Sequence, residues 1–157
     1  MNLLTIRPYI SSDKQAALKL YYNCVHRLDA YYSPEELNAW APDDNTNYEW
    51  MDELPTLYSY VAEINGQFVG FGAMRSDGEI HVVFVNSEYQ RQGIGKALLK
   101  LMVQIAKGLG LSRLYLEAGI NAVPFYAAFG FTADSEQLRE YRGHHFLLTT
   151  MSMSLNS

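Results

Sequence analysis

The sequence predicts an α/β fold of the α+β kind, in which helices flank a mixed and largely antiparallel sheet. At 157 residues the chain is close to the commonest size of one domain, and we expect 1–157 to form a single domain. The segment from Leu57 to Val85 has the two-residue period of strands and contains two tight-turn signals. Helical patterns lie on both sides of it, which predicts the flanking layers.

The N-terminal segment predicts a strand and then a helix. The letters LLTIRPY from Leu3 are typical of a short strand, and either Ser12 or Asp13 can cap the helix that follows. The apolar residues at helical spacing, which we expect on its buried face, are Ala16, Leu20, Cys24 and Leu28.

The next segment carries a helix-start signature. In YSPEELNAW, Ser33 occupies the N-cap position, Pro34 the first helical position and Glu36 the third, which is the spacing of a capping box. A further short helix is expected over TNYEWMDEL, ending before Pro55.

Three strands are predicted to follow as an antiparallel meander. They are LYSYVAEI, QFVGFGAMR and EIHVVFV. Asn65-Gly66 between the first two is the strongest two-residue hairpin signal, and Asp77-Gly78 precedes the third.

The C-terminal half alternates helices and strands. A long helix is expected from about Gly93 to Lys107, where glycines end it. A strand over SRLYLEA, a short helix over VPFYAAF and two closing strands that end in FLLTTMSMS complete the fold.

Composition limits the partners. A net charge of −5 with 48% apolar residues fits a soluble globular protein and gives no electrostatic reason to expect nucleic acid or an anionic membrane; it mildly favours a cationic partner. No signal peptide or membrane span is recognisable, so we expect a cytoplasmic protein. Cys24 is the only cysteine and is interpreted as a packing residue.

The stretch YQRQGIGKALL suggests an anion site. A dinucleotide fingerprint would need a third glycine where Leu98 stands, and a P-loop would need glycine at Glu88 and a hydroxyl at Ala97, so both nucleotide motifs fail. What remains is a turn into a helix whose first N–H groups are free, with glycines that permit close approach of an anion such as a pyrophosphate. The alternative is that Gly93 and Gly95 only ease the turn into the helix.

Two segments resemble signatures of one family. Residues 90–95, QRQGIG, match the pattern Q/R-x-x-G-x-G/A of the GNAT superfamily of N-acetyltransferases, and VVFVNSEY stands before them where that family has its fourth strand. GINAVPFYAAFGF resembles the second signature, a short helix with a tyrosine followed by Gly-Phe. The resemblance covers the whole chain, and YSPEELNAWAP is similar to a segment of a bacterial branch.

The resemblance implies a fold and a coenzyme site. The sheet would splay between the strands at 82–85 and 114–117, with acetyl-CoA in the gap as cosubstrate and no metal. The main chain of Phe84 and Val85 would pair with the pantetheine arm like an added strand, and the backbone of Arg91 to Lys96 would hold the pyrophosphate. Asn121 would contact the coenzyme from five residues before Tyr126, with Gly119 at the usual asparagine position. The residues implied in coenzyme binding are Phe84, Val85, Arg91, Gln92, Gly93, Ile94, Gly95, Lys96 and Asn121.

The chemistry of acetyl transfer to an amine requires a proton acceptor, because a protonated amine cannot attack a thioester. Glu79 is the first candidate: it stands eleven residues before Gln90, where some family members carry a catalytic glutamate, and alternation puts it on one face with His81 and Val83. His81 is the second candidate and Glu117 the third; a solvated glutamate and a structural histidine are the alternatives. The resemblance implies that Tyr126 gives a proton to the leaving thiolate; the alternative is a core tyrosine at a helix–sheet contact.

The acceptor is less defined. We expect transfer, by direct attack in a ternary complex, to a primary amine of a small molecule, peptide or protein, and an aromatic and acidic mouth would suit a cationic one. Its members would be Tyr21, Tyr22, Tyr31, Tyr32, Trp40, Tyr48, Trp50, Asp43, Asp44, Glu49, Asp52 and Glu53. The alternative is that these charges form a solvated face and that the aromatic residues are packing residues. The alternative function is an acyl-CoA-binding domain with a sensing or partner-binding role and little turnover. The family often forms homodimers, which this chain could also form.

Overall fold

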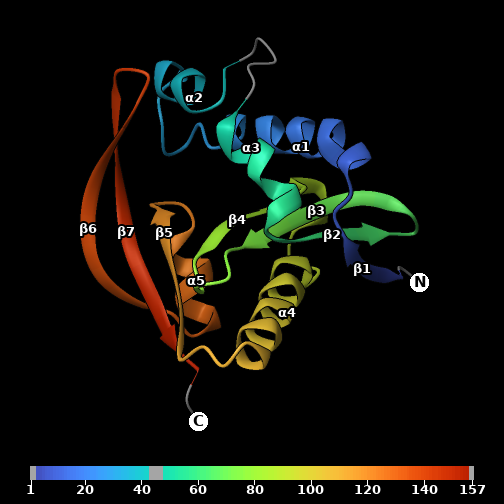
Figure 1. Ribbon diagram of the computed structural model, residues 1–157. Helices are drawn as coiled ribbons and strands as arrows, with labels where there is room; N and C mark the ends of the chain where they lie inside the picture. The colour runs from blue at the N-terminus through green and yellow to red at the C-terminus, as the bar shows by residue number, and fades with distance from the viewer. Residues whose placement is uncertain (1–2, 43–47, 156–157) are drawn as a thin grey trace.

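The strands form two sheets in the computed structural model, which describes residues 3–42 and 48–155 (Figure 1). The first sheet is antiparallel and runs in the order β1-β2-β3-β4, with bounds Leu4–Pro8, Tyr58–Ile64, Gln67–Met74 and Ile80–Val85. The second is also antiparallel and runs in the order β5-β7-β6, with β5, β6 and β7 at Arg113–Gly119, Thr132–Tyr141 and His144–Ser154.

The two sheets meet beside the turn after β3. Glu79 and Tyr115 form a parallel bridge there, and the Tyr115 amide donates to the Gly78 carbonyl at 3.1 Å. The Tyr115 hydroxyl also donates to Asp77 Oδ2 at 2.6 Å. Beyond this junction β4 and β5 diverge (Figure 1), which confirms the predicted splay.

Helices cover both faces of the first sheet. The α-helices α1 to α5 are Lys14–His26, Pro34–Trp40, Glu49–Glu53, Ile94–Gly108 and Val123–Phe129. Short 3₁₀ turns lie at Ser11–Asp13, Leu54–Thr56 and Ser87–Tyr89. Helix α1 packs on one face of β3 and β4, and α4 packs on the other, so the core is divided into clusters on the two sides (Figure 1).

Local signals were reliable where they were strong. Ser33 and Glu36 form the predicted capping box, because the Glu36 amide donates to Ser33 Oγ and the Ser33 amide donates to Glu36 Oε1. Asn65 and Gly66 have φ of 52° and 82°, as a tight hairpin of the primed type requires. The third helix begins at Glu49 with Tyr48 as its N-cap; Thr46 and Asn47 of its predicted range lie outside the described residues.

The buried face of α1 differs from the prediction. Its buried residues are Ala17, Leu20, Tyr21 and Val25. Cys24 and Leu28 are only half-buried beside this face. The predicted buried face was rotated about the helix axis because it left out Tyr21. The Tyr21 ring packs edge-on against Phe84, with centroids 5.1 Å apart.

A β-bulge interrupts β4 at His81. Ala73 pairs with Val82 and Met74 with Ile80, so His81 has no partner on β3. A bulge re-aims the side chains around it. His81 therefore faces Trp50 on the α1 side, whereas Val83 packs in the clusters on the α4 side. The expected alternation is wrong for Val83.

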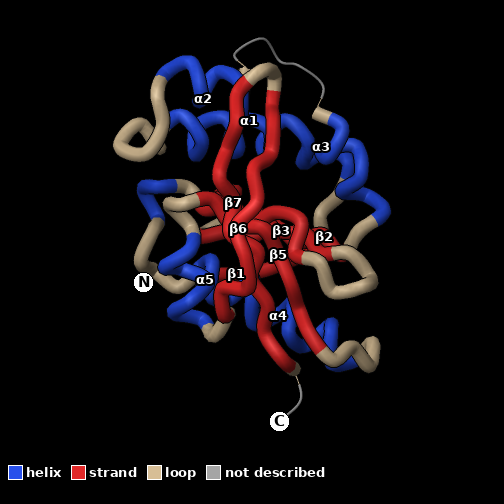
Figure 2. The backbone as a smooth tube through the Cα atoms, turned by 90° about the vertical axis from the view of Figure 1, so that its left-hand side faces the viewer, coloured by secondary structure: helices blue, strands red, loops and turns tan. Residues whose placement is uncertain are grey.

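The β6–β7 hairpin extends from the second sheet toward α2. Its turn lies beside α2 in both views (Figures 1 and 2). Arg142 in that turn donates through Nη1 to the Ala39 carbonyl at 2.7 Å. In the described part of the chain no helix is long and apolar enough to cross a membrane.

Candidate active site

The divergence of β4 and β5 opens a cleft of about 1430 Å³. Side chains from α1, β4, β5, α5 and the β6–β7 hairpin line it. Of the predicted site residues, those that line it are Glu79, His81, Phe84, Val85, Glu117, Asn121 and Tyr126. The structure thus brings together residues that lie far apart in the sequence.

The glycine loop enters α4 through a left-handed residue. Gly93 is the N-cap of α4, with φ 79°, and a Cβ added there would meet no atom within 4 Å. Arg91 also has positive φ, at 66°, and no side chain caps the helix. The first amides of α4, at Ile94, Gly95 and Lys96, are thus left without intrahelical partners.

Gly95 has a different role from Gly93. A Cβ on Gly95 would lie 2.8 Å from Phe125 Cζ, closer than real Cβ contacts. A side chain at Gly95 would therefore displace the Phe125 ring of α5, which packs against this part of α4. Of the two loop glycines, Gly93 is the one whose missing side chain leaves open space beside the start of α4.

The edge of β4 presents backbone groups to the cleft at alternate residues. The Asn86 amide donates to the Val69 carbonyl at 2.8 Å, and hydrogen-bonded pairs alternate along an antiparallel ladder. Phe84 therefore directs its N–H and C=O toward β3, whereas Val83 and Val85 direct theirs to the open edge. Consistent with this, Cys24 Sγ lies 3.3 Å from the Val85 carbonyl. The expectation of a free Phe84 main chain is wrong; its ring lines the cleft instead.

Tyr126 is held in the wall of the cleft by α5. Its ring packs edge-on against Phe125 and Phe131, with centroids 5.0 and 5.7 Å away. Burial raises the pKa of Tyr126, with no contribution from a charge or hydrogen bond. The phenol is therefore protonated at neutral pH and can donate its proton or a hydrogen bond.

Asn121 carries an unpaired polar atom at the cleft. Its Oδ1 is buried and has no hydrogen-bond partner among the described residues. At Gly119, a Cβ would lie 3.0 Å from the Tyr32 hydroxyl and 3.0 Å from Asn121 Oδ1. A side chain at 119 would therefore compete with Tyr32 and Asn121 for the same space, which explains the glycine.

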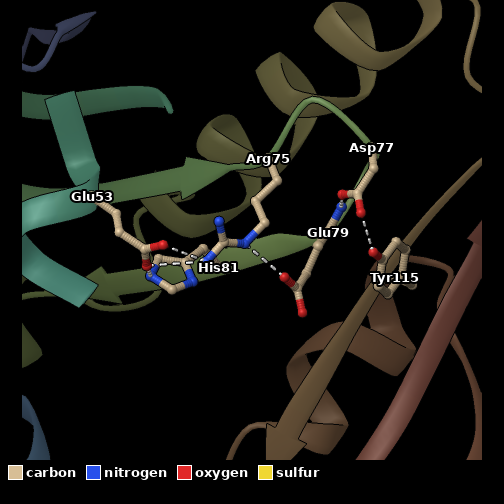
Figure 3. Close-up of polar contacts among 6 residues, drawn as sticks. All are labelled: Glu53, Arg75, Asp77, Glu79, His81 and Tyr115. Carbon is tan, nitrogen blue, oxygen red and sulfur yellow. Dashed lines mark hydrogen bonds and ion pairs between the residues drawn. The ribbon is translucent and has the colours of Figure 1, made fainter. Parts of the chain in front are cut away.

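A charged cluster lies beside the β4 bulge (Figure 3). Arg75 Nε donates to Glu79 Oε1 at 2.9 Å, and Arg75 Nη2 donates to both Glu53 oxygens at 3.0 Å. His81 Nε2 lies 3.4 Å from Glu53 Oε2, but it is buried and makes no hydrogen bond to the described residues. The contact of His81 with Glu53 is thus electrostatic.

Burial controls the protonation of His81. Desolvation and the Arg75 charge lower its pKa, against smaller opposite effects of Glu53 and Glu79. The imidazole is therefore neutral at pH 7 and able to accept a proton. Glu117, the third candidate base, is bound by Arg139, whose Nη2 donates to Oε2 at 2.6 Å.

Aromatic side chains form the wall near α1 and α2. The aromatic cleft residues on this side are Tyr21, Tyr32, Trp40, Tyr48, Trp50, Phe84 and Phe146. Tyr22 instead stacks on His26, and Tyr31 is 53% exposed outside the cleft. Of the predicted acidic residues, Glu53 lines the cleft, whereas Asp52 pairs with Lys14 at the surface. Asp43 and Asp44 lie outside the described residues, as does the side chain of Glu49.

Sequence reasoning missed Arg75 as a site residue and placed Glu53 only in the acceptor mouth. Arg75 follows β3 and Glu53 ends α3, 22 positions apart, so no local motif joins them. The only local signal was the four-residue spacing of Arg75 and Glu79 across the Asp77-Gly78 turn. Within 3–42 and 48–155, no group of three or more His, Cys, Asp or Glu side chains is placed to hold a metal ion.

Comparison with known proteins agrees with this geometry. The family profile described as "Acetyltransferase (GNAT) domain" matches residues 28–155. The chain is 35% identical over 147 residues to the Escherichia coli K12 protein named uncharacterized N-acetyltransferase YafP, covering 93% of each. It is 30% identical over 140 residues to the uncharacterized N-acetyltransferase MJ1207 of Methanocaldococcus jannaschii, covering 81% of this chain and 60% of that one.

Solved structures show the same fold. A GCN5-related N-acetyltransferase of Rhodopseudomonas palustris superposes with a TM-score of 0.90 at 25% identity, covering 96% of this chain and 94% of that one. The PaiA N-acetyltransferase of Thermoplasma acidophilum, solved with coenzyme A, superposes at 0.77 with 18% identity, covering 97% and 99%. With the matched domain and the splayed sheets, these findings show that the chain belongs to the GNAT family and is an acetyltransferase.

Proposed function

We propose that this protein transfers the acetyl group of acetyl-CoA to a primary amine of a small molecule, peptide or protein, by direct attack in a ternary complex. The observation that carries the proposal is the cleft itself. Tyr126 and the unpaired Asn121 Oδ1 line one part of it and the Glu79–His81 cluster another, so an acid and a base face the same space. The likeness to a structure holding coenzyme A supports the choice of coenzyme.

The coenzyme would bind mainly through backbone groups. The amides at the start of α4 and the open space at Gly93 suit a pyrophosphate. The outward backbone groups of Val83 and Val85 suit the amides of a pantetheine arm added like a strand. Asn121 Oδ1 would accept a hydrogen bond from the coenzyme, which would satisfy a buried acceptor that has no other partner in the described chain.

The chemical step needs one proton removed and one supplied. Glu79 lines the cleft with a side chain 34% exposed, so it can take the proton of the amine directly or through water. His81 is the competing acceptor. Tyr126, protonated at neutral pH, would donate to the thiolate that leaves when the amine displaces it. The aromatic wall and the nearby carboxylates suit a cationic amine.

A two-stage experiment tests the proposal. Calorimetry with acetyl-CoA, longer acyl-CoAs, ATP and NAD would first establish the ligand, and we expect binding of acetyl-CoA only or most tightly. Thiol release would then be followed with a panel of amines. Binding of acetyl-CoA without thiol release from any amine would support the alternative of a coenzyme-binding domain with a sensing role, and preference for ATP or NAD would overturn the proposal.

A further inference from the structure

The cluster around Arg75 contains more groups than acetyl transfer needs. A single base would suffice for the amine proton, yet Glu53, Arg75, Glu79 and His81 are joined by contacts of 2.9 to 3.4 Å. Two of these groups, Glu53 and Arg75, have no part in the proton transfers proposed above. Their side chains come from α3 and from the turn after β3 and converge on the bulge in β4 (Figure 3).

We propose that Glu53 and Arg75 are positioning residues for the proton-accepting step, acting through Glu79 and His81. Arg75 binds one oxygen of Glu79 and so fixes the orientation of that carboxylate in the cleft. The same guanidinium holds both oxygens of Glu53, which places a carboxylate beside Nε2 of His81. This inference rests on the proposed function.

The charges of the cluster favour uptake of one proton. With His81 neutral, the two carboxylates outnumber the single guanidinium, so the cluster carries one excess negative charge. When the amine N–H bond breaks, the proton passes to Glu79 or, through water, to the buried His81 Nε2, and in either case the excess negative charge of the cluster is cancelled. The proton then leaves to bulk solvent, which restores the resting state.

The groups that face His81 act in opposite directions. Glu53 from α3 and Glu79 from the start of β4 stabilise the imidazolium, whereas Arg75 destabilises it. From α3 the Trp50 ring packs edge-on at 6.3 Å, and a hydrogen bond with the Trp50 backbone raises the pKa of His81. Across the cleft, Glu117 is already bound by Arg139. Removing Glu53 and removing Arg75 should therefore shift the pKa of His81 with opposite signs, which a loss of packing would not do.

The test uses NMR titration of His81 and the pH profile of kcat/KM. Glu53→Gln should lower the pKa of His81 and move the acidic limb of kcat/KM to lower pH, by about one unit each. Arg75→Gln should move both to higher pH. Glu53→Asp keeps the charge and should restore most of the wild-type profile, whereas Asp52→Asn, on the same helix and paired at the surface with Lys14, should change neither. His81→Gln assigns the NMR signal.

The NMR titration and the kinetic profile together distinguish failure of this inference from failure of the proposed function. No shift of the His81 titration in Glu53→Gln and Arg75→Gln, or a shift of the same sign in both, would overturn the proposal. A shifted titration with an unchanged kinetic limb would also overturn it, because the cluster would then not serve the reaction. If the wild-type protein releases no thiol from any amine, the proposed function fails, and the NMR titration still reports whether Glu53 and Arg75 control His81. Binding of acetyl-CoA by each variant confirms that it is folded.

Discussion

The two sides of the cleft are built differently. The proposed coenzyme side uses two short segments: residues of 83–90 and 119–126 line the cleft, and the backbone loop 91–96 follows directly, outside the lining. The acceptor side uses side chains from α1, α2, α3, the turn after β3 and the closing hairpin. A backbone site needs glycines and a helix start in sequence, and it leaves a local signature. A site assembled from distant side chains leaves none, so the two sides differ in how much of them can be predicted.

The largest expected effect is on Tyr126, which faces the chemistry from the coenzyme side. Tyr126→Phe keeps the ring packing but removes the proton donor, so kcat should fall roughly 10² to 10⁴-fold with little change in acetyl-CoA affinity. Steady-state kinetics at saturation and calorimetry measure the two quantities. Tyr31→Phe, exposed and outside the cleft, is the control and should behave as wild type. Unchanged turnover, with chemistry limiting the rate, would remove Tyr126 from the mechanism.

The second-largest expected effect is on Glu79, which lies on the acceptor side of the cleft. Glu79→Gln keeps the shape of the side chain but cannot accept the proton, and turnover should fall about 10²-fold while coenzyme affinity holds. Glu117→Gln is a matched control, since Glu117 also lines the cleft and is also bound by an arginine. We expect it to change turnover much less.

The pH profile separates Glu79 from His81. Loss of the acidic limb of kcat/KM in Glu79→Gln and not in His81→Gln would assign the limb to the glutamate, and the reverse would assign it to the histidine. If neither variant alters the rate, both are structural. A larger loss in Glu117→Gln than in Glu79→Gln would instead make Glu117 the base.

The difference between the two sides of the cleft also explains which features the sequence could predict. The hairpin at Asn65-Gly66, the capping box at Ser33 and the splay of the sheet followed from local turn chemistry and from the family resemblance. The pairing of Arg75 with Glu53 did not, because it depends on how α3 packs beside β3. The bulge at His81 was also missed, since one unpaired residue changes the side-chain alternation of a strand without any motif.

Glycine substitutions sharpen the prediction for the coenzyme side. Gly93→Val places a β-branched residue at φ 79°, and the strain should distort the loop and weaken acetyl-CoA binding about 10- to 100-fold. Gly110 has the same kind of backbone, with φ 78° and open space, but follows α4 at its far end. Gly110→Val should therefore cost similar stability without loss of affinity. Equal acetyl-CoA affinity in the two folded variants would contradict the pyrophosphate assignment to the loop. Gly95→Val is a poorer test, because its Cβ would strike Phe125.

The smallest expected effect concerns Asp13, the buried carboxylate that precedes α1. Its substitution tests whether the acceptor side of the cleft can be destabilised without affecting the coenzyme side. Arg7 donates to both oxygens of Asp13 at 2.8 and 2.9 Å, the Ile10 amide donates to Oδ2 at 2.8 Å, and these contacts hold the pKa of Asp13 below its usual range. Because the folded pKa lies below the unfolded one, the stabilisation is present above about pH 4 and is lost as the pH falls through the folded value.

Asp13→Asn should therefore lower the free energy of unfolding by about 1–2 kcal/mol at pH 7, and by less below about pH 4. Urea denaturation at both pH values measures this difference, and Asp52→Asn should change it little. If the two sides are independent, acetyl-CoA affinity at pH 7 stays at its wild-type value in Asp13→Asn while KM for the amine rises; an equal loss of both would show that α1 supports the whole cleft.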